Sequence, residues 1–509
     1  MRICRDILLI IGSLGSLPVS AGGADSLSVF RRTMYDASPA EALPAGILRN
    51  PAAMWYKQPF PLTGLSIGYD DDRHGETSMA QEGSGYSGFG FEARSFVPTS
   101  ADGRAFGRAG YSYGSRQAVQ WSETADFALL YPYVTADSAG GDLTSERYRF
   151  SGGYAHRTGL WTWAACLDYR AQLEYREKDP RPRNVVSDLQ GSLAAARSIG
   201  PAYRLSLAVR GRKYGQRGDI AFYNPMYQAT VYHLTGLGMD YVRFAGLYTD
   251  TYYAGSGVGG SVDLFPASRS GFSVSVQYDR FAFRKQMTGL NDLPLVSLTD
   301  HTARGLLAYS ESAGPLKWGV SAEGSFRKRR GEEHIFGEPA GNIYPEIGTA
   351  DGYADRSISG KLSGFAGSSP TARIVWWVQP AVSCFDFQAA YDPTLRRLSF
   401  SRWHAAVESG AIRAWKRWML RTEVALARSG KIKGELSLPG ADFGLSRIRT
   451  LQQNYDRLTD DFTRLHLRMR IDCRVGNDRT IFVQGSWRRD WFRRNGTADG
   501  WTVSMGFGL

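Results

Sequence analysis

The chain has 509 residues and a formal net charge of +12, and it contains 58 Gly, 13 Trp, 27 Tyr and 25 Phe residues. Glycine and aromatic residues at this frequency, in short alternating runs, are unlike a soluble helical enzyme and are typical of β-barrels. After residue 21 no stretch approaches the roughly 18 to 20 uninterrupted apolar residues that a transmembrane helix needs, so helical spanning is excluded.

The first predicted element is an export signal. Arg2 and Arg5 precede and flank the start of the apolar run ILLIIGSLGSLPVSA, which has the length of a signal-peptide core and is too short to span a bilayer as a helix. The triplet ending at Ala21 fits a cleavage site, and a cut after Ala24 fits nearly as well. We therefore expect residues 1–21 to be a signal peptide, 22–61 a periplasmic or lumenal hatch segment, and 62–509 the barrel.

The segment before the first strand lacks the alternation of a strand and contains GILRNPAAMWYKQPF. Its Asn50-Pro51-Ala52 element, placed just before the first barrel strand, resembles that of FadL-type outer-membrane transporters and of barrels associated with type IX secretion. The resemblance implies that this leader folds into the barrel as a small hatch, and also implies a 14-stranded barrel. A second resemblance is to an uncharacterised family of outer-membrane barrels from Bacteroidota, which implies no mechanism.

The strands that follow have one apolar face. Between 160 and 176, large apolar side chains fall at alternate positions from Trp161 to Tyr175, whereas Asp168, Arg170 and Glu174 fall on the opposite face. The same period of two recurs in 203–212, 272–279 and 316–327. This pattern indicates strands with one face toward lipid and the other toward water.

Short and long links alternate between these strands, with short ones near 98–103 and 198–202 and long ones near 117–144, 214–254 and 428–459. This predicts an all-β fold: a transmembrane, antiparallel up-and-down β-barrel of about 18 strands, with short periplasmic turns and long extracellular loops. Weak boundaries near 185, 305, 375 and 400 leave 14 or 16 strands open. A secreted sandwich array or propeller is disfavoured because the chain shows no blade-length repeat.

The longest link, 214–254, is too apolar for a plain solvated loop. We expect it to cap the mouth, hold an apolar ligand or contact a partner protein, because tyrosine combines a large rigid surface with a polar tip. The alternative is an aromatic extension of two strands above the bilayer. The side chains proposed for contact are Tyr223, Tyr227, Tyr232, Tyr241 and Tyr248.

The strand 464–475 alternates apolar residues with basic ones. If the apolar residues face lipid, a cationic ladder lines the lumen and attracts anions into a narrow aqueous space. The alternative is that its arginines pair with carboxylates such as Glu423 and only rigidify the barrel. The ladder consists of Arg464, His466, Arg468, Arg470 and Arg474.

The chain finishes on WTVSMGFGL, in which the apolar residues occupy every second position up to Leu509. This is a strand whose apolar face contacts lipid, and it closes the barrel against the first strand. The aromatic-rich end resembles the sorting signal that barrel-assembly machinery reads. We therefore expect this machinery and outer-membrane lipid as partners, and the outer membrane of a Gram-negative bacterium as the location.

These patterns favour a channel for passive or hatch-gated uptake of a small hydrophobic or anionic solute. The alternative function is an accessory barrel of a secretion or TonB-coupled complex, which contacts another outer-membrane protein through its loops. Enzymatic activity is not expected, since the chain has only seven histidines and no His-x-Ser pair of the phospholipase type. No cofactor, metal or nucleic acid is expected.

Overall fold

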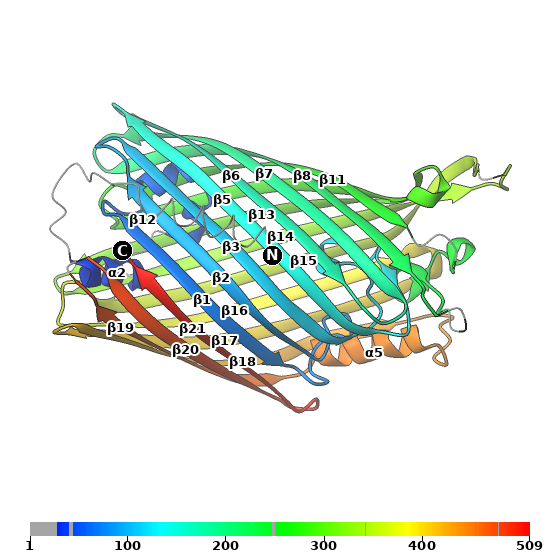
Figure 1. Cartoon of the computed structure of the whole chain (residues 1–509). Coiled ribbons are helices and arrows are strands. Elements are labelled where there is room, and N and C mark those ends of the chain that lie inside the picture. The colour runs from blue at the N-terminus through cyan, green and yellow to red at the C-terminus, as the bar shows by residue number, and fades with distance from the viewer. Residues whose placement is uncertain are drawn as a thin grey trace.

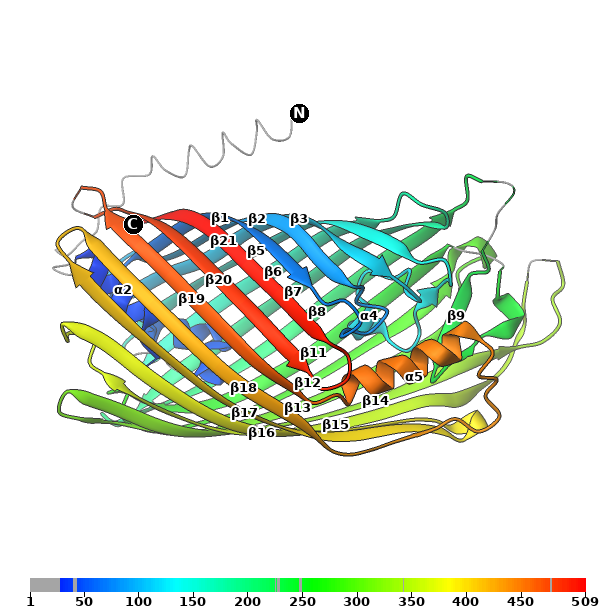
Figure 2. The same ribbon diagram turned by 90° about the horizontal axis from the view of Figure 1, so that it is seen from below.

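The main sheet of the protein closes on itself. The computed structural model describes residues 28–39, 44–224, 226, 229–246, 250–341, 343–476 and 478–509. Its main sheet has 18 antiparallel strands, and the last of them, β21, pairs with the first, β1. The prediction of a barrel of about 18 strands is confirmed (Figures 1 and 2). The predicted signal peptide falls outside the described residues.

The barrel strands follow one another around the ring in chain order. They are β1 (Leu62–Arg73), β2 (Gly85–Pro98), β3 (Gly103–Val119), β5 (Gly141–Thr158), β6 (Trp161–Tyr175), β7 (Arg181–Ile199), β8 (Tyr203–Ala221), β11 (Thr251–Pro266), β12 (Gly271–Met287), β13 (Leu293–Ala313), β14 (Leu316–Phe336), β15 (Glu346–Ser368), β16 (Ile374–Tyr391), β17 (Arg396–Trp415), β18 (Trp418–Ser437), β19 (Phe462–Arg474), β20 (Thr480–Phe492) and β21 (Thr497–Gly508).

The remaining elements lie before the first strand or in the links. They are α2 (Val29–Ala37), α3 (Ala45–Leu48), η2 (Pro51–Tyr56), α4 (Phe127–Leu130), β4 (Thr135–Ala136), β9 (Tyr232–Gly236), β10 (Met239–Asp240), η3 (Val242–Phe244), η4 (Thr288–Leu290), η5 (Asp392–Thr394) and α5 (Ser446–Leu458). Among the described residues, none of these helices is long and apolar enough to cross a membrane.

The outer wall of the barrel is apolar because every second residue of each strand points away from the lumen. Leu193, Val209 and Leu362 are 64%, 63% and 67% exposed, which is unusual for large aliphatic side chains in a water-soluble protein. On the closing strand, Met505 is 58% exposed and lies between Ile67 of β1 and Val483 of β20. These exposures fit a wall that contacts lipid.

The longest link is shorter than the sequence pattern predicted. Strand β8 continues to Ala221 and β11 begins at Thr251, so the link spans 222–250 and the predicted limits of 214 and 254 were wrong. Tyr214 and Tyr253 lie within these strands and are buried. The sequence pattern placed the link boundaries wrongly because these two tyrosines bring aromatic rings to lumen-facing positions, where polar side chains were expected.

Both ends of the lumen contain chain segments. Residues 28–39 and 44–61, with α2, α3 and η2, lie inside the barrel near the short turns, and we call them the N-terminal plug (Figure 2). Residues 120–140 and 229–246, together with α5, lie at the opposite end, where the links are long, and we call them the loop plug (Figure 1). The space between the plugs is the part of the lumen that can hold a ligand.

The alternation of faces gives a test of the lipid-facing wall. Leu362→Glu places a carboxylate in the middle of the apolar outer face of β15. It should lower the free energy of unfolding by somewhat less than the roughly 2–4 kcal/mol that a basic residue costs at this depth. Ser359→Glu, on the same strand, points toward an arginine-lined cavity of the lumen. We expect only Leu362→Glu to lower the folded fraction in denaturant titrations of the barrel in lipid vesicles. Equal losses would mean that the outer face of β15 does not contact lipid.

Candidate functional site: a chamber between two plugs

The N-terminal plug is fastened to the wall through Asn50, which is fully buried. Its Oδ1 accepts a hydrogen bond from the backbone N–H of Ala52 (3.0 Å), which caps η2 at the point where Pro51 fixes the first turn. Its Nδ2 donates to Ser206 Oγ and to Asp263 Oδ2, each at 2.7 Å. The predicted hatch motif therefore lies inside the lumen, hydrogen-bonded to strands β8 and β11, while its function as a hatch stays a prediction.

Aromatic and apolar contacts hold the rest of the N-terminal plug. The Tyr56 hydroxyl is 2.7 Å from Thr162 Oγ1, and the Arg204 guanidinium stacks over the Tyr56 ring at 4.1 Å. Helix α2 packs Phe30 and Met34 against an apolar patch that strands β16, β17 and β18 contribute to the inner wall. This plug thus contacts both sides of the ring, and it narrows the lumen at the end with the short turns.

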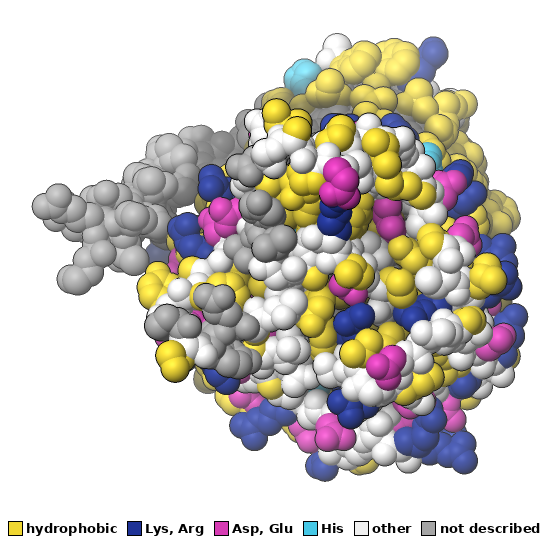
Figure 3. Space-filling model, turned by 90° about the vertical axis from the view of Figure 1, so that its right-hand side faces the viewer, with side chains coloured by type: hydrophobic (Ala, Val, Ile, Leu, Met, Phe, Trp, Pro, Cys, Tyr) yellow, Lys and Arg dark blue, Asp and Glu magenta, His cyan; other side chains and the backbone are white. Residues whose placement is uncertain are grey.

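The loop plug is built around an apolar core that the wall completes. The plug residues at most 1% exposed in this core are Leu130, Tyr133, Val134, Leu237 and Phe244. They pack against inward-facing rings and aliphatic groups of many strands, including Val186, Phe281, Leu298, Phe336 and Phe400. Strands β9, β10 and β4 form a small sheet of their own within this plug. Side chains cover the centre of this end of the barrel in Figure 3.

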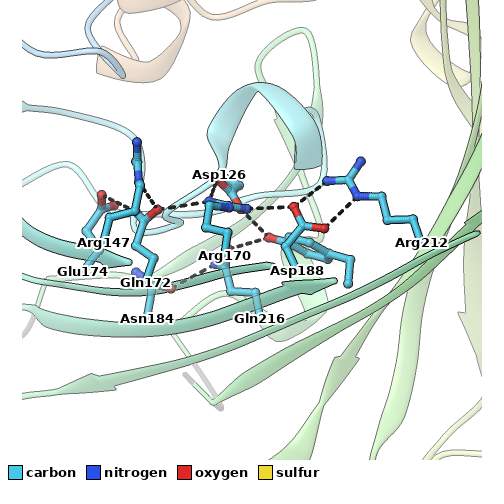
Figure 4. A network of polar contacts seen from close by, with 10 residues as sticks. Asp126, Arg147, Arg170, Gln172, Glu174, Asn184, Asp188, Arg212 and Gln216 are labelled. Atoms are coloured by element: carbon cyan, nitrogen blue, oxygen red, sulfur yellow. Dashed lines mark hydrogen bonds and ion pairs between the residues drawn. The ribbon is translucent and has the colours of Figure 1, made fainter. Parts of the chain in front are cut away.

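Polar contacts fasten the loop plug at fixed points of the wall. Asp126, at the start of α4, accepts two hydrogen bonds from Arg170 (2.9 and 2.6 Å) and one from the Tyr214 hydroxyl (2.9 Å). Arg170 also contacts Asp188 (3.3 Å), which in turn accepts two bonds from Arg212 at 2.8 Å. Figure 4 shows this chain of groups running along the wall beneath α4. Arg170 is therefore shared between the plug and the wall.

Two adjoining cavities, about 630 and 680 Å³ in volume, lie in the lumen. The first extends from Asp36 and Lys57 of the N-terminal plug to Arg170, and the second touches Arg49 of the N-terminal plug and Leu129 of the loop plug. Gln190 and Arg212 line both, so the two form one chamber. We call this space the central chamber.

The central chamber has a surplus of positive charge. Six basic residues and three aspartates line the first cavity; the second has five arginines with lumen-facing side chains and two aspartates. Asp279 neutralises Arg210 and Arg304 (2.9 and 3.0 Å), and Asp300 pairs with Arg327. Arg149, opposite Arg170 in the sheet, has no hydrogen-bond or ion-pair partner within the described chain. Such a space can bind an anion that is small enough to fit between the plugs.

The predicted ladder on β19 is largely neutralised. Arg464 makes a two-bond contact with Asp490 (2.6 and 2.7 Å), Arg468 contacts Glu423 (2.6 Å), and Arg470 contacts Asp472 (2.7 Å). Arg474 lies 5.9 Å from the ring of Phe30 in the N-terminal plug, and His466 is partly buried between Arg464 and Arg468. This geometry favours the structural alternative, with Glu423 as one of the carboxylates, and an anion path along the ladder stays a prediction.

The tyrosines of the longest link do not form a single site. Tyr232 packs against Trp121 and Tyr241 against Phe244, both inside the loop plug. Tyr223 is 69% exposed and is stacked by the Arg181 guanidinium at 4.3 Å. Tyr227 and Tyr248 lie outside the described residues. The link therefore contributes to the cap over the mouth, as one of the expectations had it, while ligand or partner contact stays a prediction.

Sequence reasoning placed Arg170, Arg210 and Arg212 on a water-facing side of their strands, and they line the chamber as that alternation implies. It missed Asp126 and Arg149, because nothing near Asp126 marks a loop that folds inward. The sequence also contains a Gly-x-Ser-x-Gly pattern at 110–114. This pattern lies within β3, away from the strand-to-helix turn that a nucleophile elbow requires.

Comparison with known proteins gives a family without an assigned activity. A family model described as "Family of unknown function (DUF6850)" matches residues 51–509. No curated protein matches the sequence. An origin in Bacteroidota stays an expectation.

Solved structures of outer-membrane receptors and channels are similar to this chain at low identity. The ferric preacinetobactin receptor BauA of Acinetobacter baumannii has a TM-score of 0.39 and 9% identity over 89% of this chain and 80% of its own. The toluene transporter TbuX of Ralstonia pickettii has a TM-score of 0.31 and 9% identity over 92% and 93%. The monoaromatic hydrocarbon channel CymD has a TM-score of 0.32 and 10% identity over 91% of each chain. Likenesses this distant carry no argument about the solute.

The contact between Tyr133 and β14 allows the loop plug to be displaced by one substitution. A Cβ at Gly331 would lie 2.0 Å from the Tyr133 hydroxyl oxygen and 2.4 Å from its ring, and Tyr133 is fully buried. We expect Gly331→Val to destabilise the plug by about 1–3 kcal/mol and to raise conductance in planar bilayers. Gly324→Val is the matched control, because a Cβ at Gly324 meets nothing within 4 Å. Unchanged conductance in Gly331→Val would contradict the closing role of the plug.

A buried carboxylate pair lies at the base of the loop plug. Arg176 is 2.8 Å from Glu123 and 2.6 Å from Asp137, and all three side chains are at most 1% exposed. Burial raises the pKa of Glu123 well above its usual value, and the contact with Asp137 raises it further. Burial would also raise the pKa of Asp137, but contacts with Glu123 and Arg176 hold that pKa below its usual value. Asp137 is therefore the anion that neutralises Arg176, and Glu123 keeps its proton to a higher pH than a free glutamate.

This pair makes the stability of the loop plug depend on pH. Glu123 binds its proton more tightly in the folded state, so the protonated side chain stabilises the loop plug. This contribution to stability is complete below the unfolded pKa of about 4.3 and is lost as pH rises through the raised folded pKa. Hydrogen-exchange protection factors in 120–140 should fall with rising pH across this window. We expect Glu123→Gln to remove the fall, and an equal fall in both proteins would rule out Glu123 as its source.

Proposed function

We propose that this chain, which belongs to the DUF6850 family of unknown function, is an outer-membrane uptake barrel that admits a small anionic solute through the central chamber. A transport role agrees with a closed barrel that is wide enough to enclose a chamber. The observation that supports an anionic solute is the positive charge of that chamber. An apolar solute is less well supported, because charged or amide side chains make up about half of the residues that line each cavity.

Arg149 and Arg212 are the residues best placed to hold the anion. Arg149 has no partner in the described chain and points into the first cavity from β5. Arg212 lines both cavities and pairs only with Asp188 among carboxylates of the described residues. A carboxylate, phosphate or sulfate group can accept two hydrogen bonds from one guanidinium. The chamber thus offers directional contacts as well as charge.

Anion binding would also weaken the attachment of the loop plug. Arg170 divides its donors between Asp126 of the plug and Asp188 of the wall. An anion beside Arg170 competes with Asp126 for those donors, and so favours a state in which α4 has moved away from the wall. Release toward the periplasm then requires the N-terminal plug to move, which is the hatch role that the Asn50-Pro51-Ala52 resemblance implies.

The alternative function is an accessory barrel that binds another outer-membrane protein through its loops. It draws less support from the structure, since Tyr232 and Tyr241 pack inside the loop plug and leave Tyr223 as the exposed tyrosine among the three described. Lipid of the outer membrane and the barrel-assembly machinery remain proposed partners in either case, and the location is proposed from the apolar outer wall.

Ion selectivity tests the chamber. A charge within about 10 Å of the path contributes roughly 0.4 kcal/mol in water, with opposite sign for an anion and a cation. Arg149→Gln together with Arg212→Gln should therefore lower the ratio of anion to cation permeability by about 16-fold. The measurement is the reversal potential in a salt gradient near 0.01 M, where screening extends to roughly 30 Å. Every variant should also be measured in the Gly331→Val background, so that a closed loop plug does not hide the result.

The matched control removes one ion pair from the ladder, as Arg464→Gln with Asp490→Asn. It deletes lumen-facing groups but leaves the net charge unchanged, so selectivity should stay as in the parent. If the chamber variant keeps the parent selectivity, the anion path through the central chamber is wrong. If the control lowers selectivity as much, the ladder rather than the chamber lines the path.

A further inference from the structure

The outward face of strands β12 to β15 changes from apolar to basic as the strands approach the long links. In the last apolar row, Tyr278, Ala303, Phe326 and Ile358 lie opposite one another across the four strands. Three of these side chains are large, and they are 50%, 43% and 49% exposed in strand order. This row is the upper edge of the lipid-facing wall on these strands.

The next outward positions form a continuous basic row. Arg280 lies opposite His301, His301 opposite Lys328, and Lys328 opposite Arg356. Neighbouring strands are about 4.8 Å apart, so each of these groups lies beside the next. Like charges directly opposite one another destabilise a sheet unless an anion lies between them. We call these four residues the cationic row.

The protein itself supplies little compensating charge to the cationic row. Arg356 donates to the Gln388 amide oxygen (2.8 Å), and His301 shares a hydrogen bond with a tyrosine hydroxyl at 2.7 Å, so both have neutral partners. Arg280 and Lys328 have no hydrogen-bond or ion-pair partner in the part of the chain that the structure describes. Both side chains are exposed. Arg280, Lys328 and Arg356 therefore have no carboxylate partner among the described residues.

An open depression of about 700 Å³ lies over the row on the outer wall. Hydroxyl groups of Ser297 and Thr299 line it beside the basic side chains. Its carboxylates are Glu332 and Asp351, and Asp351 is held by an ion pair with Arg330. Hydroxyl, guanidinium and ammonium donors around one concavity are the groups that bind phosphate oxygens.

The cationic row is local to this side of the barrel. On strands β1 and β2 the aromatic pair Tyr69 and Phe89 lies at the same position relative to the apolar wall. The next outward row there consists of Asp71, Ser87 and, on β3, Ser115, with no basic residue. If the basic residues only attracted the barrel to an anionic membrane surface, rows of them would be expected around the whole ring. Outward basic residues occur on other strands too, but Lys213 of β8 lies between Leu189 and Ser256 and has no basic neighbour across the sheet. Four basic residues side by side therefore point to a bound molecule.

We propose that the cationic row binds the phosphate groups of an anionic lipid whose acyl chains pack on the apolar rows below it. The proposal rests on the membrane location that is part of the proposed function, and on no property of the central chamber. A lipid fits better than free phosphate because Arg280 and Lys328, which line the depression, are two residues along their strands from Tyr278 and Phe326. These exposed rings supply an apolar surface for the chains. The bound lipid removes the repulsion within the row and joins four strands at their outer edge.

Lipid binding to the purified full-length barrel in detergent tests this site by native mass spectrometry. The probes are lipid A with two phosphate groups, the same lipid without phosphate, and inorganic phosphate as competitor. Each charge-assisted hydrogen bond lost costs about tenfold in affinity, so Arg280→Gln with Lys328→Gln should weaken binding of the phosphorylated lipid by about 100-fold. Binding of the dephosphorylated lipid should be weak and unchanged.

The matched control is Arg183→Gln with Lys213→Gln, which removes two outward basic groups from strands β7 and β8. It should bind the phosphorylated lipid as the parent does. If both double variants lose lipid affinity equally, the binding is general electrostatic attraction and the proposed site is wrong. If millimolar phosphate displaces the lipid completely, the row is a site for free phosphate instead. Heat modifiability shows that each variant is folded. Selectivity of the chamber is measured separately, so lipid binding with unselective conductance would overturn only the proposed function.

Discussion

The hydrogen bonds between β1 and β21 are the constraint on which the rest of the structure depends. In lipid, a strand edge leaves its backbone N–H and C=O groups without partners, so a membrane sheet must close. Here the first and last strands meet, with the Leu509 N–H donating to Thr63 O and the Thr63 N–H donating to Leu509 O. Closure over 18 strands makes a ring too wide for wall side chains to fill, so the lumen has room for other segments of the chain and for water.

The two plugs fill the lumen by different means. The N-terminal plug relies on Asn50, whose amide satisfies polar groups on β8 and β11, while the loop plug relies on an apolar core that the strands complete. A buried charge without a partner is costly, and Arg170 and Arg176 beside the loop plug pair with carboxylates. Arg149 remains unpaired where the chamber leaves room for water. Within the central chamber, Arg149 therefore marks a place at which an anion can replace water.

Much of the barrel was predictable, because alternation with a period of two records which face meets lipid. The 18 strands, their alternating short and long links and the outward face of the closing strand follow from it, and so does the inward direction of Arg170 and Arg212. The links could not be delimited, since Tyr214 and Tyr253 bring apolar rings to lumen-facing positions. Alternation contains no information about what fills a lumen.

The candidate site was predicted less well for a related reason. The ladder on β19 was correctly read as a set of side chains on one face, but the carboxylates that neutralise it come from β18, from β20 and from its own strand. Pairing across strands depends on register, which sequence spacing alone does not give. Asp126 reaches the wall only because 120–140 folds inward. The charge of the chamber is thus a sum over distant segments, and only the folded barrel reveals it.

The sharing of Arg170 links the solute to the loop plug in both directions. If an anion in the chamber weakens the contact between Arg170 and Asp126 by some factor, then a closed plug must weaken anion binding by the same factor. The Tyr214 hydroxyl would still donate to Asp126 after Arg170 is lost, so α4 would be loosened without being detached. The N-terminal plug makes no use of Arg170 and is held through Asn50, on the far side of the chamber. In the proposed function the two plugs therefore open independently, so that a solute crosses the barrel without both ends being open at once.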